Sequence, residues 1–275
     1  MTALEAVRAA ARELEAAGVP SPRVDAEHLV ADVLRTSRTG LYASDRPLGE
    51  RHLLRLRSLV DRRRAREPLA YVLGEWGFRR LTLRVDRRAL VPRPETEVVV
   101  ERCLEHVREL AEPRVLDIGV GSGAIALALA DEHPGARVVA LDASPEALSL
   151  ARENLARADV DGRVELRKGD LLGGVSGPFD LVVSNPPYVR PDDYEHLQPE
   201  IRLWEPREAL VGIGVGETIA HDACAVLRPG GRLVLECGDG QAAALSAELR
   251  ALGYEDVRTT ADLAGRGRVV EGRRP

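Results

Sequence analysis

Residues 115–124 read Val-Leu-Asp-Ile-Gly-Val-Gly-Ser-Gly-Ala, and this stretch decides the fold. It predicts a buried strand that runs into a glycine-rich turn, followed by a helix over residues 124–131. Glycines in such a turn let the backbone approach a ligand closely, and they leave the helix N-terminus facing that ligand. The same spacing satisfies the dinucleotide fingerprint, so the glycines alone do not separate NAD from other nucleoside cofactors.

Apolar segments alternate with helical segments from Arg114 onward, which predicts an α/β domain with an open parallel sheet covered on both faces. The later strands are expected at residues 137–141, 164–167, 179–184 and 231–236, with a closing antiparallel pair at residues 257–260 and 268–270. Ligands of such sheets bind beyond the carboxyl ends of the strands, at the topological switch. The residues that follow the strands are therefore the candidates for a site.

Three aspartates fall at these strand ends and narrow the choice of cofactor. Asp117 lies two residues before the first glycine, where an anion suits the ammonium of a methionine moiety better than a pyrophosphate. Asp142 ends the second strand and can accept hydrogen bonds from both hydroxyls of a ribose. Asp170 follows the third strand, where an adenine amino group could donate to it. As a set they favour S-adenosylmethionine over NAD, although each one alone is also an ordinary turn or helix-cap residue.

The segment Asn185-Pro186-Pro187-Tyr188 directly follows the fourth strand. The side-chain oxygen of Asn185 can accept one N–H of a planar NH2 group and the Pro186 carbonyl can accept the other, while Tyr188 packs on the flat face of that group. Two acceptors at fixed angles would point the weakly nucleophilic nitrogen lone pair at an electrophile. The alternative is a proline-stiffened turn without any chemistry.

The N-terminal part of the chain has a different pattern. Residues 1–75 are expected to form a small helical domain, with a break between helices at residues 38–47. Residues 76–98 are expected to form a β-hairpin-like linker with a short strand at residues 90–91. Residues 99–275 then form the cofactor-binding catalytic domain.

Charge is unevenly distributed along the chain, whose net charge is −5. Residues 1–80 carry 15 Arg against 11 Asp plus Glu, a balance of +4, which leaves −9 for the remainder. The negative net charge argues against a protein whose main function is to bind the phosphates of duplex nucleic acid. The arginines at positions 62, 63, 64 and 66 either solvate a helix or form a basic face for an acidic partner or RNA.

The spacing of the cysteines and the length of the apolar runs argue against disulfide-stabilised, metal-binding and membrane-spanning proteins. Cys103, Cys224 and Cys237 show no CxxC spacing, so neither a disulfide framework nor a metal site is predicted. No run approaches the roughly 20 apolar residues of a membrane span, and the N-terminus lacks a signal-peptide pattern. We therefore expect a cytoplasmic protein without metal or membrane contact.

Several motifs together resemble one family. Residues 117–123, Asp-Ile-Gly-Val-Gly-Ser-Gly, and 184–189, Ser-Asn-Pro-Pro-Tyr-Val, resemble class I methyltransferases that act on exocyclic or amide NH2 groups. Residues 67–74, Glu-Pro-Leu-Ala-Tyr-Val-Leu-Gly, and 90–97, Leu-Val-Pro-Arg-Pro-Glu-Thr-Glu, narrow the resemblance to the release factor glutamine methyltransferases, the PrmC or HemK family. The resemblance implies a Rossmann-like, seven-stranded sheet with an antiparallel last strand, joined to a small N-terminal helical bundle.

The activity implied by this resemblance is S-adenosylmethionine-dependent N5-methylation of the glutamine in the Gly-Gly-Gln motif of peptide chain release factors, the proteins of translation termination. The helical domain would contact the release factor, and no nucleic-acid substrate is expected. By family pattern, the glutamine amide would be held by Asn185, Pro186, Pro187 and Tyr188, with Asn185, Pro186 and Tyr188 carrying the catalysis. The cofactor would be held by Asp117, Gly119, Val120, Gly121, Ser122, Gly123, Asp142, Asp170, Leu171 and Asn185.

Some positions depart from the family pattern. Val120 replaces a common threonine, Leu171 stands where an aromatic side chain is frequent beside adenine, and residues 211–216 match the Gly-Gly-x-Asp-Gly loop poorly. Glu95 and Glu97 either order the linker over the cofactor or cap a helix that begins near Thr96. Two other functions stay open: N6-adenine methylation of nucleic acid, and cofactor binding without methyl transfer.

Overall fold

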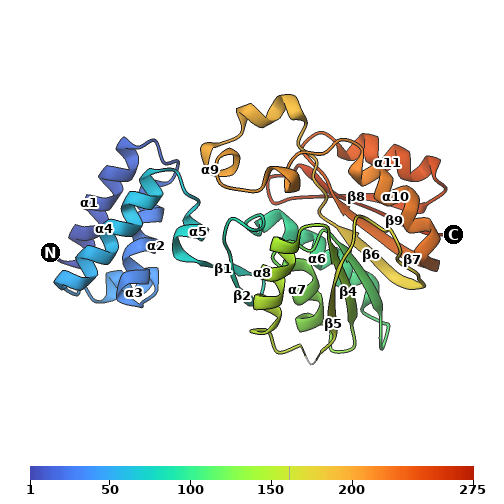
Figure 1. Ribbon diagram of the computed structural model, residues 1–275, viewed down its shortest axis with the longest axis horizontal. Helices are drawn as coiled ribbons and strands as arrows, with labels where there is room; N and C mark the ends of the chain where they lie inside the picture. The colour runs from blue at the N-terminus through green and yellow to red at the C-terminus, as the bar shows by residue number, and fades with distance from the viewer. Residues whose placement is uncertain (161) are drawn as a thin grey trace. The chain divides into compact units, whose positions relative to one another are not determined.

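The computed structural model describes residues 1–160 and 162–275, which form two compact units (Figure 1). We call them the helical unit and the sheet unit. The helical unit consists of residues 1–75 and 198–204, and the sheet unit of residues 76–197 and 205–275. A short segment late in the chain therefore belongs to the helical unit.

The helical unit is built from α1 (Ala3–Ala16), α2 (Pro22–Leu34), α3 (Arg38–Ala43), α4 (Glu50–Arg64), α5 (Leu69–Leu73) and the late helix α9 (Pro199–Arg202). Thr2 starts α1 with a capping box: its hydroxyl accepts from Glu5 N, and the Glu5 carboxylate accepts from Thr2 N. Ala10 and Leu14 lie on the buried face of α1. The break expected at residues 38–47 is wrong in its first half, because Ser37 caps α3 there by accepting a hydrogen bond from Gly40 N.

Most of the arginine cluster is paired inside the helical unit. The pairs are Arg62 with Glu67 (2.5 Å), Arg63 with Asp25 (2.7 Å) and with Glu200 (2.8 Å), and Arg66 with Glu200 (2.7 Å). Glu200 lies on α9, so these ion pairs fasten the late segment to helix α4 and its end. Both interpretations from the sequence, a solvated helix face and a free basic surface, are thus wrong for Arg63 and Arg66. Arg62 and Arg64 are exposed, as a solvated helix face requires, although each also forms an ion pair.

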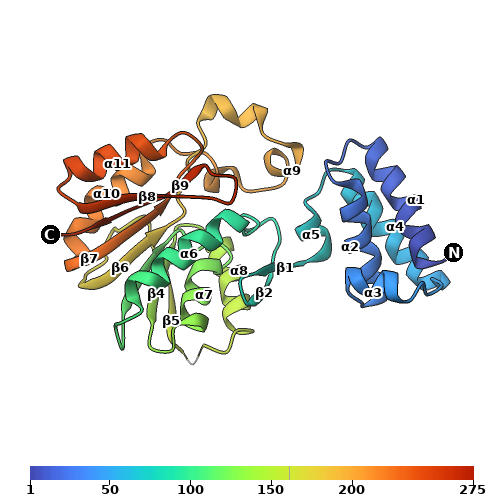
Figure 2. The same cartoon turned by 180° about the vertical axis from the view of Figure 1, so that it is seen from behind.

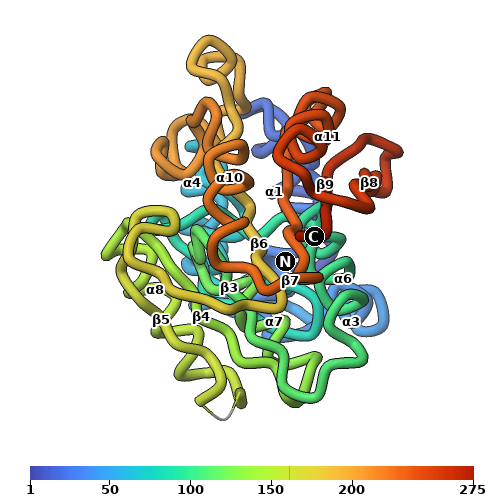
Figure 3. Tube along the Cα trace, turned by 90° about the vertical axis from the view of Figure 1, so that its right-hand side faces the viewer, coloured from blue at the N-terminus to red at the C-terminus, as the bar shows by residue number. Residues whose placement is uncertain are grey.

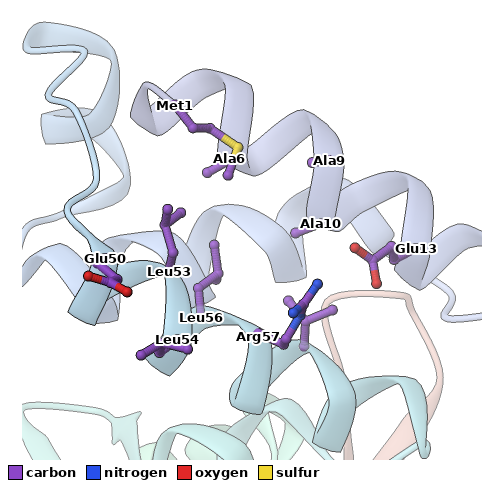
Figure 4. Close-up of a pocket in the computed structure, with 11 residues that line it drawn as sticks. Met1, Ala6, Ala9, Ala10, Glu13, Glu50, Leu53, Leu54, Leu56 and Arg57 are labelled. Carbon is purple, nitrogen blue, oxygen red and sulfur yellow. The ribbon is translucent and has the colours of Figure 1, made fainter.

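A hollow of about 340 Å³ lies between α1 and α4 (Figure 4). Its walls are mainly apolar and include Ala6, Leu53 and Leu56, and Glu13 and Arg57 contribute charge. The hollow belongs to the helical unit alone. All residues that the sequence predicts to hold cofactor or glutamine belong to the sheet unit.

The sheet unit contains a seven-stranded sheet in the order β5-β4-β3-β6-β7-β9-β8. Strands β3 to β7 run parallel, whereas β9 pairs antiparallel with β7 and with β8. The predicted α/β class with an antiparallel last strand is therefore confirmed. The bounds are β3 (Arg114–Ile118), β4 (Arg137–Asp142), β5 (Val164–Lys168), β6 (Phe179–Ser184), β7 (Leu227–Glu236), β8 (Glu255–Ala261) and β9 (Gly267–Arg273).

Helices cover both faces of this sheet (Figures 1 and 2). One face carries α6 (Pro94–Val107), α7 (Ala124–Glu132) and α8 (Pro145–Leu155), and the other carries α10 (Val215–Val226) and α11 (Ala242–Ala251). Figure 3 shows α10 and α11 on the opposite side of β6 and β7 from α6 and α7. Apolar side chains of the central strands, such as Leu116, Val182 and Leu233, are fully buried against α10 and α11.

The remaining elements are short. The linker forms a hairpin of β1 (Glu75–Phe78) and β2 (Leu81–Arg84), and the strand expected at residues 90–91 is wrong. Two 3-10 turns, η1 (Pro191–His196) and η2 (Arg207–Ala209), flank the late segment of the helical unit. The strand order reverses between β3 and β6, which puts the topological switch at the carboxyl ends of those two strands.

Candidate active site

The ends of β3 and β6 bring the glycine turn beside the Asn-Pro-Pro-Tyr segment. Ile118 pairs with Ser184 in the sheet, and the Ser184 hydroxyl donates to the Ile118 carbonyl (2.7 Å). Gly119 and Asn185 are the next residues of the two strands, and a methyl group on Gly119 would come within 4.0 Å of the Asn185 carbonyl oxygen. The two most informative motifs of the sequence therefore meet at one point.

The glycine turn has a backbone that other residues adopt with difficulty. Gly119, Gly121 and Gly123 have φ angles of 78°, 55° and 91°, in the left-handed region. The N–H groups of Gly119 and Val120 both donate to the Leu141 carbonyl (2.9 and 2.8 Å), which ties the turn to the end of β4. The Val120 side chain is buried, so a valine suits this position and leaves little of Val120 for a ligand.

Asp142 supports the same turn. One carboxylate oxygen accepts from Gly121 N and the other from Ser144 N, each at 2.9 Å. The side chain is half-buried, and each oxygen keeps a second lone pair. Asp142 therefore both holds the turn and start of α8 in place and retains acceptor capacity for a ligand.

Asp117 is entirely buried beneath the turn. Its Oδ2 accepts from Ala126 N (3.1 Å), whereas Oδ1 has no hydrogen-bond partner among the described residues. Burial, with a smaller contribution from the charge of Asp142, raises the pKa of Asp117 to about 7. A positive charge held above the turn would stabilise this carboxylate across the intervening backbone.

Asp170 and Leu171 follow β5. Asp170 is exposed, and the N–H of the preceding Gly169 donates to the Asp142 carbonyl (3.1 Å), so Asp170 and Asp142 share one edge of the sheet. Leu171 has a φ of 48° and packs against the apolar core on the α10 face. Its side chain thus belongs partly to the core.

Asn185 is connected to a buried acid. Its Nδ2 donates to Thr96 Oγ1 (3.3 Å), and Thr96 Oγ1 donates to Glu236 Oε2 (2.7 Å). The Tyr188 hydroxyl is 3.4 Å from Glu236 Oε1. Burial, and to a lesser degree the charge of Glu95, raises the pKa of Glu236 to about 7, while burial and the nearby Glu236 raise the pKa of Tyr188.

The backbone of the Asn-Pro-Pro-Tyr segment is also fixed. Gln241 Nε2 donates to the Tyr188 carbonyl (3.0 Å), and Gln241 Oε1 accepts from Gly238 N (2.9 Å). A methyl group on Gly238 would lie 3.1 Å from the Tyr188 ring, and one on Gly212 would lie 2.7 Å from the Pro187 carbonyl oxygen. These close approaches and hydrogen bonds hold Pro187 and Tyr188 in one arrangement.

Comparison with known proteins bears on what this site does. Two family models match the chain: the PrmC N-terminal domain over residues 5–74 and the methyltransferase small domain over residues 96–201. A release factor glutamine methyltransferase of Deinococcus radiodurans is 46% identical over 96% of both chains. The chain belongs to the release factor glutamine methyltransferase family. A second relative of the same name, from Caulobacter vibrioides, is 40% identical and covers 99% of this chain and 96% of its own.

Solved structures support the fold of this family member. The hMettl16 catalytic domain, crystallised in complex with MAT2A 3'UTR hairpin 6, superimposes with a TM-score of 0.55 at 15% identity. The match covers 69% of this chain and 74% of that one. No trio of His, Cys, Asp or Glu side chains within residues 1–160 and 162–275 is arranged to hold a metal ion. None of the described helices has both the length and the apolar composition to cross a membrane.

Sequence reasoning missed Thr96, Glu236, Gln241 and Asn154 in this methyltransferase. Glu236 could have been noticed as an acid that ends an apolar strand, but its partner Thr96 is 140 residues away. The helix expected near Thr96 begins at Pro94, with Glu95 and Glu97 in its first turn. The capping interpretation is wrong for Glu97, which instead accepts from Arg79 N in the linker hairpin (3.0 Å). Thr96 reaches Glu236.

Asn154 on α8 binds the glycine turn to the hairpin. Its Nδ2 donates to the Ser122 carbonyl (2.8 Å) and the Arg84 carbonyl (3.0 Å), and its Oδ1 accepts from Arg84 N (2.7 Å). We expect Asn154→Ala to lower the free energy of unfolding by about 3 kcal/mol, because it leaves buried backbone groups unpaired. Urea denaturation measures this change, and a loss within experimental error would contradict the bracing role.

Proposed function

We propose that this chain transfers a methyl group from S-adenosylmethionine to the side-chain nitrogen of the glutamine in the Gly-Gly-Gln motif of peptide chain release factors. Membership of the family supports the reaction. The observation that carries the assignment to this site is the Asn185 carboxamide, which follows β6 beside Gly119 and donates through Nδ2 to Thr96. By the same resemblance, the helical unit contacts the release factor, and the reaction takes place in the cytoplasm.

The residues at the strand ends fit S-adenosylmethionine. Asp142 has acceptor capacity for ribose hydroxyls, and the exposed Asp170 can accept from an adenine amino group. Asp117 Oδ1 has no hydrogen-bond partner among residues 1–160 and 162–275, and a nearby ammonium would stabilise the ionised form of this carboxyl. The left-handed glycines leave the turn without side chains that would obstruct the ligand. When bound, the cofactor supplies an electrophilic methyl group on a sulfonium.

The Asn-Pro-Pro-Tyr segment would orient the amide nitrogen. Asn185 Oδ1 accepts one N–H of the glutamine side chain, and the Pro186 carbonyl accepts the other. Holding both hydrogens points the nitrogen lone pair in one direction, and such alignment can contribute roughly 7 to 11 kcal/mol to lowering a barrier. Tyr188 packs on the flat face of the amide. No strong base is required, because the nitrogen becomes acidic as it gains the methyl group.

Cofactor affinity should depend on pH through Asp117. Below the raised pKa of about 7 this carboxyl is protonated, and binding of an ammonium must release that proton. We expect the association constant of S-adenosylhomocysteine to rise by up to about tenfold per pH unit below the pKa, and to level off above it. Calorimetry in buffers with different ionisation enthalpies measures the proton release.

The matched variant for this test is Asp117→Asn, which keeps the shape of the side chain. It should bind with little pH dependence and with lower affinity at about pH 8 than the wild type. A wild-type slope that survives unchanged in Asp117→Asn would assign the titration to another group and contradict the electrostatic role of Asp117.

The function itself is tested by methyl transfer in solution. The purified chain is incubated with labelled S-adenosylmethionine and, separately, with a release factor, its Gly-Gly-Gln glutamine-to-alanine variant, duplex DNA and RNA. We expect label only on the unaltered release factor, mapped by mass spectrometry to one glutamine. Label on adenine would instead establish the nucleic-acid activity, and cofactor binding without transfer to any acceptor would establish a non-catalytic protein.

A further inference from the structure

A short hydrogen-bonded chain runs from Asn185 into the core of the sheet unit. Its members are Asn185 after β6, Thr96 in the first turns of α6 and Glu236 at the end of β7. Thr96 is 4% exposed and Glu236 is 2% exposed, whereas Asn185 is only half-buried. A buried carboxylate at the end of such a chain must be accounted for, because burying a charge is costly.

The chemistry of the three groups dictates the direction of each hydrogen bond. An ionised carboxylate only accepts, so the single proton of the Thr96 hydroxyl must point to Glu236 (2.7 Å). The Thr96 oxygen then presents a lone pair to Asn185, and only the NH2 end of a carboxamide can donate to it (3.3 Å). The carbonyl end, Oδ1, is thereby left for the incoming amide.

We propose that Thr96 and Glu236 are positioning residues that decide which end of the Asn185 carboxamide faces the substrate. This inference rests on the proposed function. If the Asn185 carboxamide were rotated by a half-turn, its NH2 group would face the NH2 group of the glutamine, and no hydrogen bond could form between them. Thr96 and Glu236 themselves touch neither cofactor nor substrate in this assignment. They act through Asn185.

The orientation of the Asn185 carboxamide depends on whether Glu236 is ionised. Among the described residues, the charged and titratable groups that face it are Glu95 on α6, Tyr188 after β6, Arg268 on β9 and the next residue along the chain, Cys237, just after β7. Burial and Glu95 raise its pKa to about 7, although Thr96, Tyr188 and Arg268 favour the ionised form. Once protonated, Glu236 can donate to Thr96, whose own proton is then available to Asn185 Oδ1, and both orientations of the carboxamide become possible.

The composition of the chain makes this orientation directly measurable. Asn154 and Asn185 are the only two asparagines, so ¹⁵N-asparagine labelling of the full chain gives two side-chain NH2 groups. Asn185→Ala assigns the remaining signal to Asn154, whose NH2 is held by two backbone carbonyls and serves as the internal reference.

We expect the Asn185 NH2 resonances of the wild type to shift with pH, with a midpoint near 7, while those of Asn154 stay constant. In Thr96→Val, which removes the hydroxyl and keeps the shape, the Asn185 shift should lose this pH dependence. Thr96→Ser should keep it. An Asn185 signal that does not titrate in the wild type, or that titrates equally in Thr96→Val, would overturn the proposal.

Kinetics give the second readout. We expect Thr96→Val to lower kcat by about ten- to a hundredfold, with KM and cofactor affinity nearly unchanged, and Thr96→Ser to restore kcat to within about threefold. The control is Thr218→Val on α10, which removes an exposed hydroxyl that donates to the carbonyl of Gly214, the residue before that helix. Wild-type turnover in a folded Thr96→Val would contradict the role. Absence of methyl transfer in the wild type would refute the proposed function, while the labelled amide would still report on the orientation of Asn185.

Discussion

Replacing Asn185 with alanine is expected to lower kcat by about a hundred- to a thousandfold, because the acceptor that orients the glutamine nitrogen is lost. Cofactor affinity should fall by no more than several-fold, since the glycine turn and Asp142 are tied to each other independently of the Asn185 side chain. The fold should persist, because Asn185 is only half-buried and donates one side-chain hydrogen bond to Thr96. Single-turnover kinetics with calorimetry separates the two quantities.

Asn185→Gln is the matched control that separates the presence of a carboxamide from its position. It keeps the carboxamide but moves it by one methylene, so the acceptor no longer sits where Thr96 holds it. We expect a loss of kcat close to that of Asn185→Ala, because orientation rather than the mere presence of an amide supplies the rate. Wild-type-like turnover in either variant would show that the amide nitrogen is held elsewhere.

Asp142→Ala is expected to have the largest effect on cofactor binding, a loss of about a hundredfold in affinity. Two contributions add: the ribose loses its acceptors, and the N–H groups of Gly121 and Ser144 lose the carboxylate that holds the turn and start of α8 in place. Titration calorimetry with S-adenosylhomocysteine measures this loss directly.

The control for this variant is an aspartate at the opposite end of the sheet. Asp180 near the start of β6 accepts from Arg114 N (2.7 Å) and pairs with Arg228, far along the strands from the glycine turn. Asp180→Asn should leave cofactor affinity unchanged even if it lowers stability. Equal losses from Asp142→Ala and Asp180→Asn would mean that the effect is general destabilisation and not a ligand contact.

Most of the predictions about the sheet came from local sequence patterns. Apolar runs of strand length predicted where the strands of the sheet lie along the chain. The glycines and aspartates that follow these runs indicated the edge of the sheet where β3 and β6 end. The start of β7 was placed four residues late, because Pro229-Gly230-Gly231 is typical of a turn. In the structure the strand continues through this stretch with a register shift against β6, between Phe179 and Leu181.

Contacts between distant parts of the chain were not predictable in the same way. Glu200 binds Arg63 and Arg66 across more than 130 residues, so the pairing of these two arginines inside the helical unit could not be predicted from their neighbours in the sequence. Thr96 and Glu236 are equally remote, and nothing local distinguishes a threonine that orients an active-site amide from a threonine that starts a helix. The candidate residues at the strand ends could be named from the sequence, whereas the groups that hold them needed the fold.

The most direct test of how Asn185 holds the glutamine amide is a crystal structure of the enzyme with S-adenosylhomocysteine and the Gly-Gly-Gln domain of a release factor. We expect the glutamine nitrogen at about 2.9 Å from both Asn185 Oδ1 and the Pro186 carbonyl oxygen, with Asn185 Nδ2 still donating to Thr96. An Asn185 side chain turned away from the glutamine, with the amide held by other groups, would contradict this prediction.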